Sequence, residues 1–285
     1  TQMRRDVELA LSQGSYDLVV CDARHSGIHD LIEARPVPRK ITQLWSGAGR
    51  DEPISQLFLR RLREERVIDH SIGQPSAQLF FRPEERRLAA AMWSQLGVIE
   101  EQTIVLNVHS GVAVKRWPAE RFVTIGRRLT EDGWTIAVLA GDAPRAAWEI
   151  AEAIPAARFV PKVGLRQSAA CLANTALVVS GDSGLAHLAN AVGAPVLAIF
   201  GPTWAGRYGV GSPSVNLGSP FECPERNPLN FTTQRCWYTG RCIFTGKATC
   251  CEDVTSDEVL AAARNLLGRN AAGSLPGSTR EGDGA

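Results

Sequence analysis

The 285-residue sequence has almost no excess charge, because 31 lysines and arginines stand against 30 aspartates and glutamates. A nucleic-acid-binding protein normally carries a strong basic field, so this balance argues against a nucleic-acid partner. Arginine clusters do occur at 60–63 and 127–128, where we expect solvated helix faces. No apolar run reaches the roughly 18 residues that a membrane-spanning helix needs, and no signal peptide leads the sequence. We therefore expect a cytoplasmic protein with at most peripheral membrane contact.

The sequence also lacks a Cys-x-x-Cys pattern, although it contains seven cysteines. Cys21 and Cys171 lie in apolar segments, where a thiol behaves as a small core side chain. The others lie in a loop-like region, in which Trp237 and Tyr238 are expected to pack against the loop rather than bind a sugar. Four thiolates could hold zinc or iron there, and the candidates are Cys223, Cys236, Cys242 and Cys250. Since the usual metal spacing is missing and a cytoplasmic setting disfavours disulfides, we expect reduced thiols without a metal, with a metal or disulfides as alternatives.

Apolar runs and amphipathic segments alternate along the chain, which indicates an α/β fold with a parallel sheet and helices on both faces. The expected strands are 16–21, 40–45, 103–108, 134–140, 176–180 and 195–200. The expected helices are 54–66, 83–96, 119–131, 143–153, 165–173 and 183–192. Thr255 and Glu258 have the spacing of a capping box and open a final helix to about Leu267. From Arg269 onward, small and charged residues predict a disordered tail.

The apolar run 176–179 leads into a Gly-Asp-Ser-Gly turn and then directly into a helical pattern. The first N–H groups of a helix lack intrahelical partners and carry a partial positive charge, which suits a phosphate. Ser183 and Gly184 would offer such groups without steric obstruction. Asp182 would cap the helix or hold a sugar hydroxyl, and His187 follows one turn later on the same face. Taken alone, the pattern fits an ordinary helix cap with a half-buried histidine equally well.

A second turn favours the phosphate interpretation. The strand at 103–108 runs into the His-Ser-Gly turn at 109–111, and Lys115 follows on a loop just before Trp117. In open α/β sheets a ligand lies outside the carboxyl ends of the strands, so the two turns are expected to share one ligand. Taken alone, Lys115 and Arg116 would be a solvated basic pair.

The segments HSGVAVKRWPAERF, from residue 109, and VVSGDSGLAHLANAVGAPVLAIFGPT, from residue 178, resemble those of glycosyltransferase family nine, the ADP-heptose:lipopolysaccharide heptosyltransferases and their relatives. The resemblance covers about residues 101–268 well and residues 15–100 more loosely. It implies a GT-B-like α/β fold of two facing Rossmann-like domains with parallel sheets. The implied parts are a reduced N-terminal acceptor-side domain at 1–100, a C-terminal nucleotide-sugar-binding domain at 101–254, a helix at 255–268 and a tail at 269–285.

The resemblance also implies roles for individual residues. Lys115 and Asp182 are the catalytic candidates, and Lys115 would neutralise the donor phosphates. The implied donor site comprises Ser110, Gly111, Lys115, Asp182, Ser183, Gly184, His187, Gly201, Pro202 and Thr203, with Leu165 against the adenine. No Asp-x-Asp metal-binding pattern occurs, so Lys115 and the helix beginning at Ser183 would replace a metal ion. We therefore expect no cofactor.

Two features depart from the family. The glycine-rich strand–turn–helix unit that supplies the family's catalytic carboxylate has no counterpart in this sequence, which begins with the helix before the first strand. Either the sequence is a fragment or a processed form, or the enzyme works with a reduced acceptor domain. Asp22 and nearby His25 are the replacement bases that the sequence offers, although a turn-capping aspartate and a surface histidine are the simpler interpretations. Arg145 lies near a position where relatives often carry an acidic residue that helps to hold the donor.

The resemblance, together with the two turns, implies an inverting, metal-independent glycosyltransferase that moves a heptose or a related sugar from a nucleotide-sugar such as ADP-heptose. The acceptor would be a lipopolysaccharide core or a similar glycan. The protein itself would contact the cytoplasmic face of the inner membrane only peripherally. Two alternatives are a nucleotide-sugar-binding protein of the same fold without catalysis, and a sugar-nucleotide epimerase, for which the sequence offers no clear acid–base pair.

Overall fold

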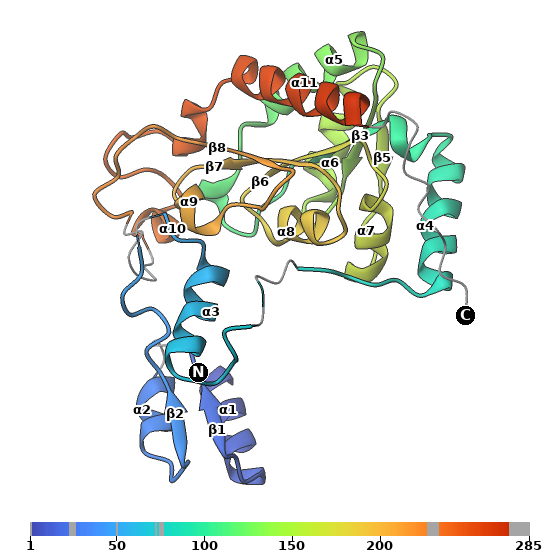
Figure 1. The fold of residues 1–285 in the computed structure, drawn as a ribbon. Coiled ribbons are helices and arrows are strands. Elements are labelled where there is room, and N and C mark those ends of the chain that lie inside the picture. The colour runs from blue at the N-terminus through green and yellow to red at the C-terminus, as the bar shows by residue number, and fades with distance from the viewer. Residues whose placement is uncertain are drawn as a thin grey trace. The chain divides into compact units, whose positions relative to one another are not determined.

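The computed structural model describes residues 2–22, 27–49, 51–71, 73, 77–226 and 234–273. The chain divides near residue 75 into two compact units, and each is described by itself. The N-terminal unit contains α1 (Gln2–Gln13), β1 (Leu18–Val20), α2 (Ile28–Glu33), β2 (Arg39–Ile41) and α3 (Ile54–Glu64) (Figure 1). Its two strands pair in parallel, with Leu18 opposite Arg39 and Val20 opposite Ile41.

The C-terminal unit is built on a six-stranded parallel sheet in the order β5-β4-β3-β6-β7-β8. Its strands are β3 (Thr103–Asn107), β4 (Thr135–Leu139), β5 (Arg158–Val160), β6 (Leu177–Gly181), β7 (Val196–Phe200) and β8 (Val215–Gly218). Its α-helices are α4 (Pro83–Leu96), α5 (Ala119–Glu131), α6 (Pro144–Glu152), α7 (Leu165–Leu172), α8 (Gly184–Ala191), α9 (Ala205–Tyr208), α10 (Cys236–Thr239) and α11 (Ser256–Gly273). Single 3₁₀ turns lie at η1 (Glu100–Gln102), η2 (Ala113–Lys115) and η3 (Cys250–Asp253).

Alternate residues of each strand enter two different cores, as the two-residue period of a strand requires. Leu106 and Val179 face a core shared with α5, α6 and α11, whereas Val105 and Val178 face a core shared with α4, α7 and α8. Figure 1 shows α5 and α11 on one side of this sheet and α7 and α8 on the other. Because both faces are covered, the strands are nearly continuous apolar runs, and polar residues gather at their carboxyl ends.

The expected strands and helices of the C-terminal unit are present with small shifts at their ends, and the capping box at Thr255 is confirmed by its reciprocal bonds with Glu258. The division near residue 75 differs from the predicted boundary at 100. The reason is α4, whose buried Met92 and Trp93 belong to a core of the C-terminal unit. The final helix continues to Gly273, and the remainder of the predicted tail lies outside the described residues. Within the described part of the chain, no helix is sufficiently long and apolar to cross a membrane.

Candidate functional site

The candidate site lies where β3 and β6 run side by side at the centre of the sheet. After β3 the chain builds outward through β4 and β5, and it then returns to place β6 on the other side of β3. Such a reversal leaves a crevice at the carboxyl ends of the two strands, where α/β proteins bind their ligands. The two turns identified from the sequence follow Asn107 and Gly181, which end these strands.

An ion pair joins the two turns. The Lys115 ammonium lies 2.8 Å from Oδ2 of Asp182, and the two side chains are 15% and 8% exposed. The same carboxylate oxygen accepts a hydrogen bond from the hydroxyl group of Thr203, in the turn after β7. The backbone approach is close, because a Cβ on Gly181 would lie 3.0 Å from the Lys115 carbonyl oxygen. We call Lys115, Asp182 and Thr203, with Ser183 and Gly184 beside them, the Lys115–Asp182 cluster.

Asn107 fixes the two turns relative to each other, and the sequence interpretation missed it. Its side-chain amide donates to the hydroxyls of Ser180 at 2.8 Å and Ser183 at 3.0 Å. From the other turn, the Ser110 hydroxyl donates to the carbonyl of Asp182 at 3.1 Å. The signal for Asn107 was a polar amide directly after three apolar residues, at the last position of a fully buried strand. These bonds pre-organise the cluster before any ligand binds.

Helix α8 begins inside the cluster, as predicted. Ser183 is its N-cap and accepts from the backbone N–H of Ala186. Gly184 is exposed, and a Cβ built there would meet nothing within 4 Å, so a ligand can approach the first amides of the helix. His187 lies one turn further along with an exposed face. Partial desolvation lowers its pKa, the nearby Asp182 carboxylate opposes that shift, and the Lys115 ammonium adds to it, so the ring is mainly neutral near pH 7.

A cavity of about 260 Å³ opens at the carboxyl ends of β3, β4 and β5. Its walls are mainly apolar and include Leu165, the residue predicted to lie against an adenine. Its polar contributors are Asn107, Asp142, Lys162 and Ser168. An apolar cavity with a few polar groups is the usual form of a small-molecule site, and this one is slightly smaller than the common range of about 300–1,000 Å³.

Asp142, and not Arg145, is the charged residue of this turn that reaches the cavity. Arg145 does not line the cavity, because its side chain is 93% exposed and pairs with Glu149 at 2.9 Å. Asp142 does line it and pairs with Lys162 at 2.5 Å, a contact that lowers the pKa of the carboxyl group. The signal was the position of Asp142 directly after the strand-ending turn at Gly141.

Residues 223–226 and 234–251, which contain five of the seven cysteines, are called the cysteine-rich segment. This segment supports the turn at Gly201, Pro202 and Thr203. Arg226 donates to the Gly201 carbonyl at 2.7 Å, and the Gln234 side chain donates to the Pro202 carbonyl. A Cβ on Gly201 would lie only 2.4 Å from the sulfur of Cys251, so this packing requires glycine. The predicted residue Thr203 therefore reaches Asp182 from a firmly supported turn.

The four cysteines predicted as metal candidates line one small cavity of about 20 Å³, which is room for roughly one water molecule. They are Cys223, Cys236, Cys242 and Cys250. Among the described residues, however, no three His, Cys, Asp or Glu side chains are arranged to hold a metal ion. All seven cysteines are free thiols. Cys171 is buried as expected, whereas Cys21, predicted to be a core residue, is only half-buried.

The N-terminal unit contains the base candidate Asp22 and one of the arginine clusters. Asp22 is exposed, and its backbone carbonyl accepts the indole N–H of Trp45 at 3.2 Å. The second base candidate, His25, lies outside the described residues.

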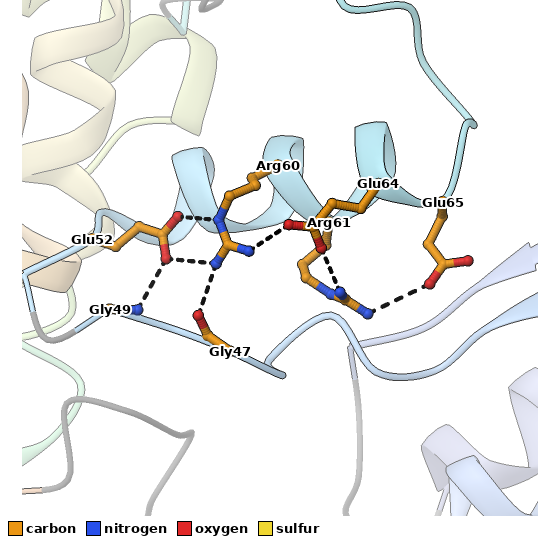
Figure 2. Close-up of polar contacts among 7 residues, drawn as sticks. All are labelled: Gly47, Gly49, Glu52, Arg60, Arg61, Glu64 and Glu65. Carbon is orange, nitrogen blue, oxygen red and sulfur yellow. Dashed lines mark hydrogen bonds and ion pairs between the residues drawn. The ribbon is translucent and has the colours of Figure 1, made fainter.

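Glutamates compensate the arginine cluster on α3 (Figure 2). Arg60 pairs with Glu52 and Glu64 at 2.8 Å each, and Arg61 pairs with Glu64 and Glu65 at 2.5 and 3.5 Å. The Arg60 side chain is 38% exposed, as a solvated face requires, whereas the Arg61 side chain is only 18% exposed and lies largely covered. Both guanidinium groups already contact carboxylates, so neither needs a ligand to explain it.

Comparisons with known proteins place these features in a family. Residues 55–226, more than half of the chain, match the model for glycosyltransferase family 9 (heptosyltransferase). The chain is 29% identical over 229 residues to lipopolysaccharide heptosyltransferase 1 of Pseudomonas aeruginosa, covering 75% of this chain and 62% of that protein. It is 35% identical over 123 residues to lipopolysaccharide heptosyltransferase 1 of Escherichia coli K12, covering 42% of this chain and 37% of that protein. The chain thus spans less than two thirds of the length of these curated relatives.

Solved structures resemble the fold. The glycosyl transferase family 9 structure from Veillonella parvula aligns with a TM-score of 0.72 at 20% identity, over 94% of this chain and 78% of that one. E. coli heptosyltransferase WaaC with ADP aligns with a TM-score of 0.56 at 21% identity, over 93% and 77%. The expected GT-B-like α/β class with parallel sheets is confirmed by these neighbours. The family model matches more than half of the chain, and the matched residues include every member of the Lys115–Asp182 cluster. The chain therefore belongs to glycosyltransferase family 9.

Proposed function

We propose that this chain transfers a heptose or a related sugar from a nucleotide-sugar, ADP-heptose in the first place, to a lipopolysaccharide core or a similar glycan. The observation that carries the proposal is the Lys115–Asp182 cluster, in which an ammonium group and a helix N-terminus converge at the crevice of the sheet. The names of the relatives, lipopolysaccharide heptosyltransferases, favour this sugar and acceptor.

The proposed reaction is a single displacement with inversion at the anomeric carbon. The acceptor hydroxyl oxygen forms a bond to that carbon while the bond from the carbon to the diphosphate oxygen breaks. The electron pair of the broken bond leaves with the nucleoside diphosphate, and the hydroxyl proton passes to a base. Negative charge therefore grows on the diphosphate, where the Lys115 ammonium and the first amides of α8 stabilise it. This pair of groups would do the work for which other glycosyltransferases use a metal ion.

The nucleoside would occupy the cavity of about 260 Å³ beside the cluster. Leu165 offers an apolar surface to the base, and the Asp142 carboxylate at the cavity wall suits the hydroxyls of a ribose. Solved E. coli WaaC contains ADP, which is consistent with an adenosine diphosphate here. Asp22 stays our candidate for the base, and a glycolipid acceptor would bring the protein to the cytoplasmic face of the inner membrane.

The experiment is incubation of the protein with ADP-heptose and a heptose-free lipid acceptor, with ADP release and product mass followed together. Transfer should produce one ADP for each heptose added to the acceptor. Lys115→Ala should lower turnover at saturating donor, and Arg145→Ala, which changes an exposed cation in the same unit, should not. Near-unchanged turnover of Lys115→Ala would remove Lys115 from the mechanism.

Two other outcomes contradict transferase activity. Binding of ADP-heptose without product would support the binding protein without catalysis. A rearranged, free sugar nucleotide would support the epimerase. Chelator in the assay should leave transfer unchanged, and a loss of activity restored by a divalent cation would contradict metal independence.

A further inference from the structure

The aromatic ring of Trp237 lies against the Lys115 ammonium, at 4.7 Å from Nζ to the ring centroid. This is within the roughly 6 Å at which a cation is attracted to the face of an indole. Trp237 belongs to α10, in the cysteine-rich segment, and is half-buried. Sequence interpretation placed this ring against its own loop, whereas the structure brings it to the central cation of the candidate site.

The position of the ring is fixed by the segment that carries it. The Trp237 backbone N–H donates to the Gln234 carbonyl at 3.0 Å, and the Gln234 side chain bonds the Pro202 carbonyl. From the other end of the segment, the Thr249 hydroxyl donates to the carbonyl of Val114, the neighbour of Lys115. One segment thus supports both the lysine turn and the threonine turn of the cluster.

The indole contributes its face rather than its hydrogen-bond donor. Its Nε1–H is buried and has no acceptor among the described residues. The Lys115 ammonium has two partners of different character, which are the charged Asp182 carboxylate and the neutral ring of Trp237. A carboxylate would repel an incoming diphosphate and cancel the charge that attracts it. An aromatic face holds the ammonium in place without adding negative charge, and it also shields one side of the ammonium from water.

We propose that Trp237 is a positioning residue that holds the Lys115 ammonium in the crevice, so that a diphosphate can share it with Asp182. This proposal rests on the proposed function, because it concerns how Lys115 meets the donor. It identifies the ligand moiety concerned as the diphosphate, not the nucleoside.

Isothermal titration with two probes, ADP and adenosine, tests the proposal. Trp237→Leu should weaken ADP about 3- to 30-fold, the range that corresponds to a partly shielded cation–π contact, and it should leave adenosine unchanged. Trp237→Phe, which keeps an aromatic face, should recover most of the ADP affinity. Tyr238→Leu is the matched control, because Tyr238 follows in the same helix and is 81% exposed. With ADP-heptose as substrate, Trp237→Leu should raise KM for the donor more than it lowers kcat.

A double-mutant cycle separates this role from simple packing. In a Lys115→Met background, Trp237→Leu should have no further effect on ADP, since the cation that the ring holds is gone. Site-specific insertion of fluorinated tryptophans at position 237 keeps the shape of the ring and weakens its negative face, so ADP affinity should fall stepwise with the number of fluorines. That series also covers the case in which Trp237→Leu does not fold.

An equal loss of ADP affinity in the Lys115→Met background, an equal loss for adenosine, or no dependence on fluorination would each overturn the proposal and leave the nucleotide site intact. Absence of ADP binding by the unmodified chain would instead overturn the proposed function, and the role of Trp237 with it.

Discussion

The Lys115 ammonium and the Asp182 carboxylate form a 2.8 Å ion pair between the loops that follow two neighbouring strands. The two groups are nearly enclosed, so each depends on the other to offset the loss of solvating water. The pair therefore holds the site together and also carries the charge that a donor phosphate would share.

Asp182→Asn should destabilise the protein strongly, because it leaves the Lys115 ammonium largely buried without its carboxylate. Removing one partner of a buried pair costs about 3–5 kcal/mol of unfolding free energy. Adding Lys115→Met to Asp182→Asn should recover much of that loss. Urea unfolding of Asp182→Asn and of the double variant measures both effects. Glu149→Gln, which breaks the exposed pair with Arg145, is the control and should cost no more than about 1 kcal/mol. Equal losses of unfolding free energy in Asp182→Asn and Glu149→Gln would contradict the enclosed pair.

Gly184→Ala should separate ligand binding from stability. A methyl group there meets nothing within 4 Å, and alanine favours a helix start over glycine, so the unfolding free energy should stay the same or rise slightly. The methyl would lie where a phosphate approaches the first amides of α8, and ADP should bind about tenfold more weakly, as expected when a hydrogen bond to a charged group is weakened. Gly268→Ala in α11, also in open space, is the control for titration. Unchanged ADP affinity in Gly184→Ala would contradict a phosphate at this helix end.

Gly201→Ala should behave in the opposite way. Its Cβ would lie 2.4 Å from the Cys251 sulfur and 3.0 Å from the Cys251 backbone nitrogen, so the turn or the segment behind it must shift. Overpacking of this kind costs about 1–3 kcal/mol. Cys251→Ala in the same chain should relieve only part of the strain, because the contact with the backbone remains. Thermal unfolding of the two variants and of Gly184→Ala checks this, and a fully stable Gly201→Ala would show that the packing is looser than we find.

The sequence was sufficient for the four central strands of the sheet and for the residues of the Lys115–Asp182 cluster. Long apolar runs ending in small polar turns are easily recognised, and parallel topology brings their carboxyl ends to one edge of a sheet. That is why Lys115 and Asp182, 67 positions apart, were predicted together and are found paired. The edge strands β5 and β8 were missed because they have three and four residues, too few for a clear period.

Residues that act across long sequence distances were harder to predict. Asp142 was overlooked in favour of Arg145 because the sequence alone does not say which side chain of a turn lines a cavity. Trp237 meets Lys115 through an irregular segment whose path follows no period, so no spacing relates the two residues. Cys223 and Cys250 likewise line one cavity without any recognisable metal-binding spacing.

Thiol titration should find seven reactive cysteines in the denatured chain and no disulfide. In the native protein we expect Cys250 to react slowly, because burial raises the pKa of its thiol to about 12 and the thiolate is the reactive form. Cys242 should react earlier than its burial suggests, since hydrogen bonds around Thr245 outweigh desolvation and lower its pKa. Fewer thiols after denaturation would reveal disulfides, and one zinc or iron per chain in elemental analysis would assign the metal to the four candidate cysteines.

The neutral state of His187 predicts a pH dependence with opposite signs for folding and for binding. Desolvation holds its folded pKa below the ordinary value of 6.5, so between those two values the unfolded chain binds more protons. The unfolding free energy should therefore fall as the pH drops below about 6.5, and this part of the slope should vanish in His187→Gln.

A bound diphosphate would favour the protonated ring, so ADP affinity should rise over the same interval with uptake of a proton. Titration calorimetry in buffers of different ionisation enthalpy measures that uptake. His109, whose pKa is also lowered by burial, remains in both proteins, so the difference between them isolates His187. Proton uptake that persists in His187→Gln would assign the titration to another group and place the diphosphate away from the first turn of α8.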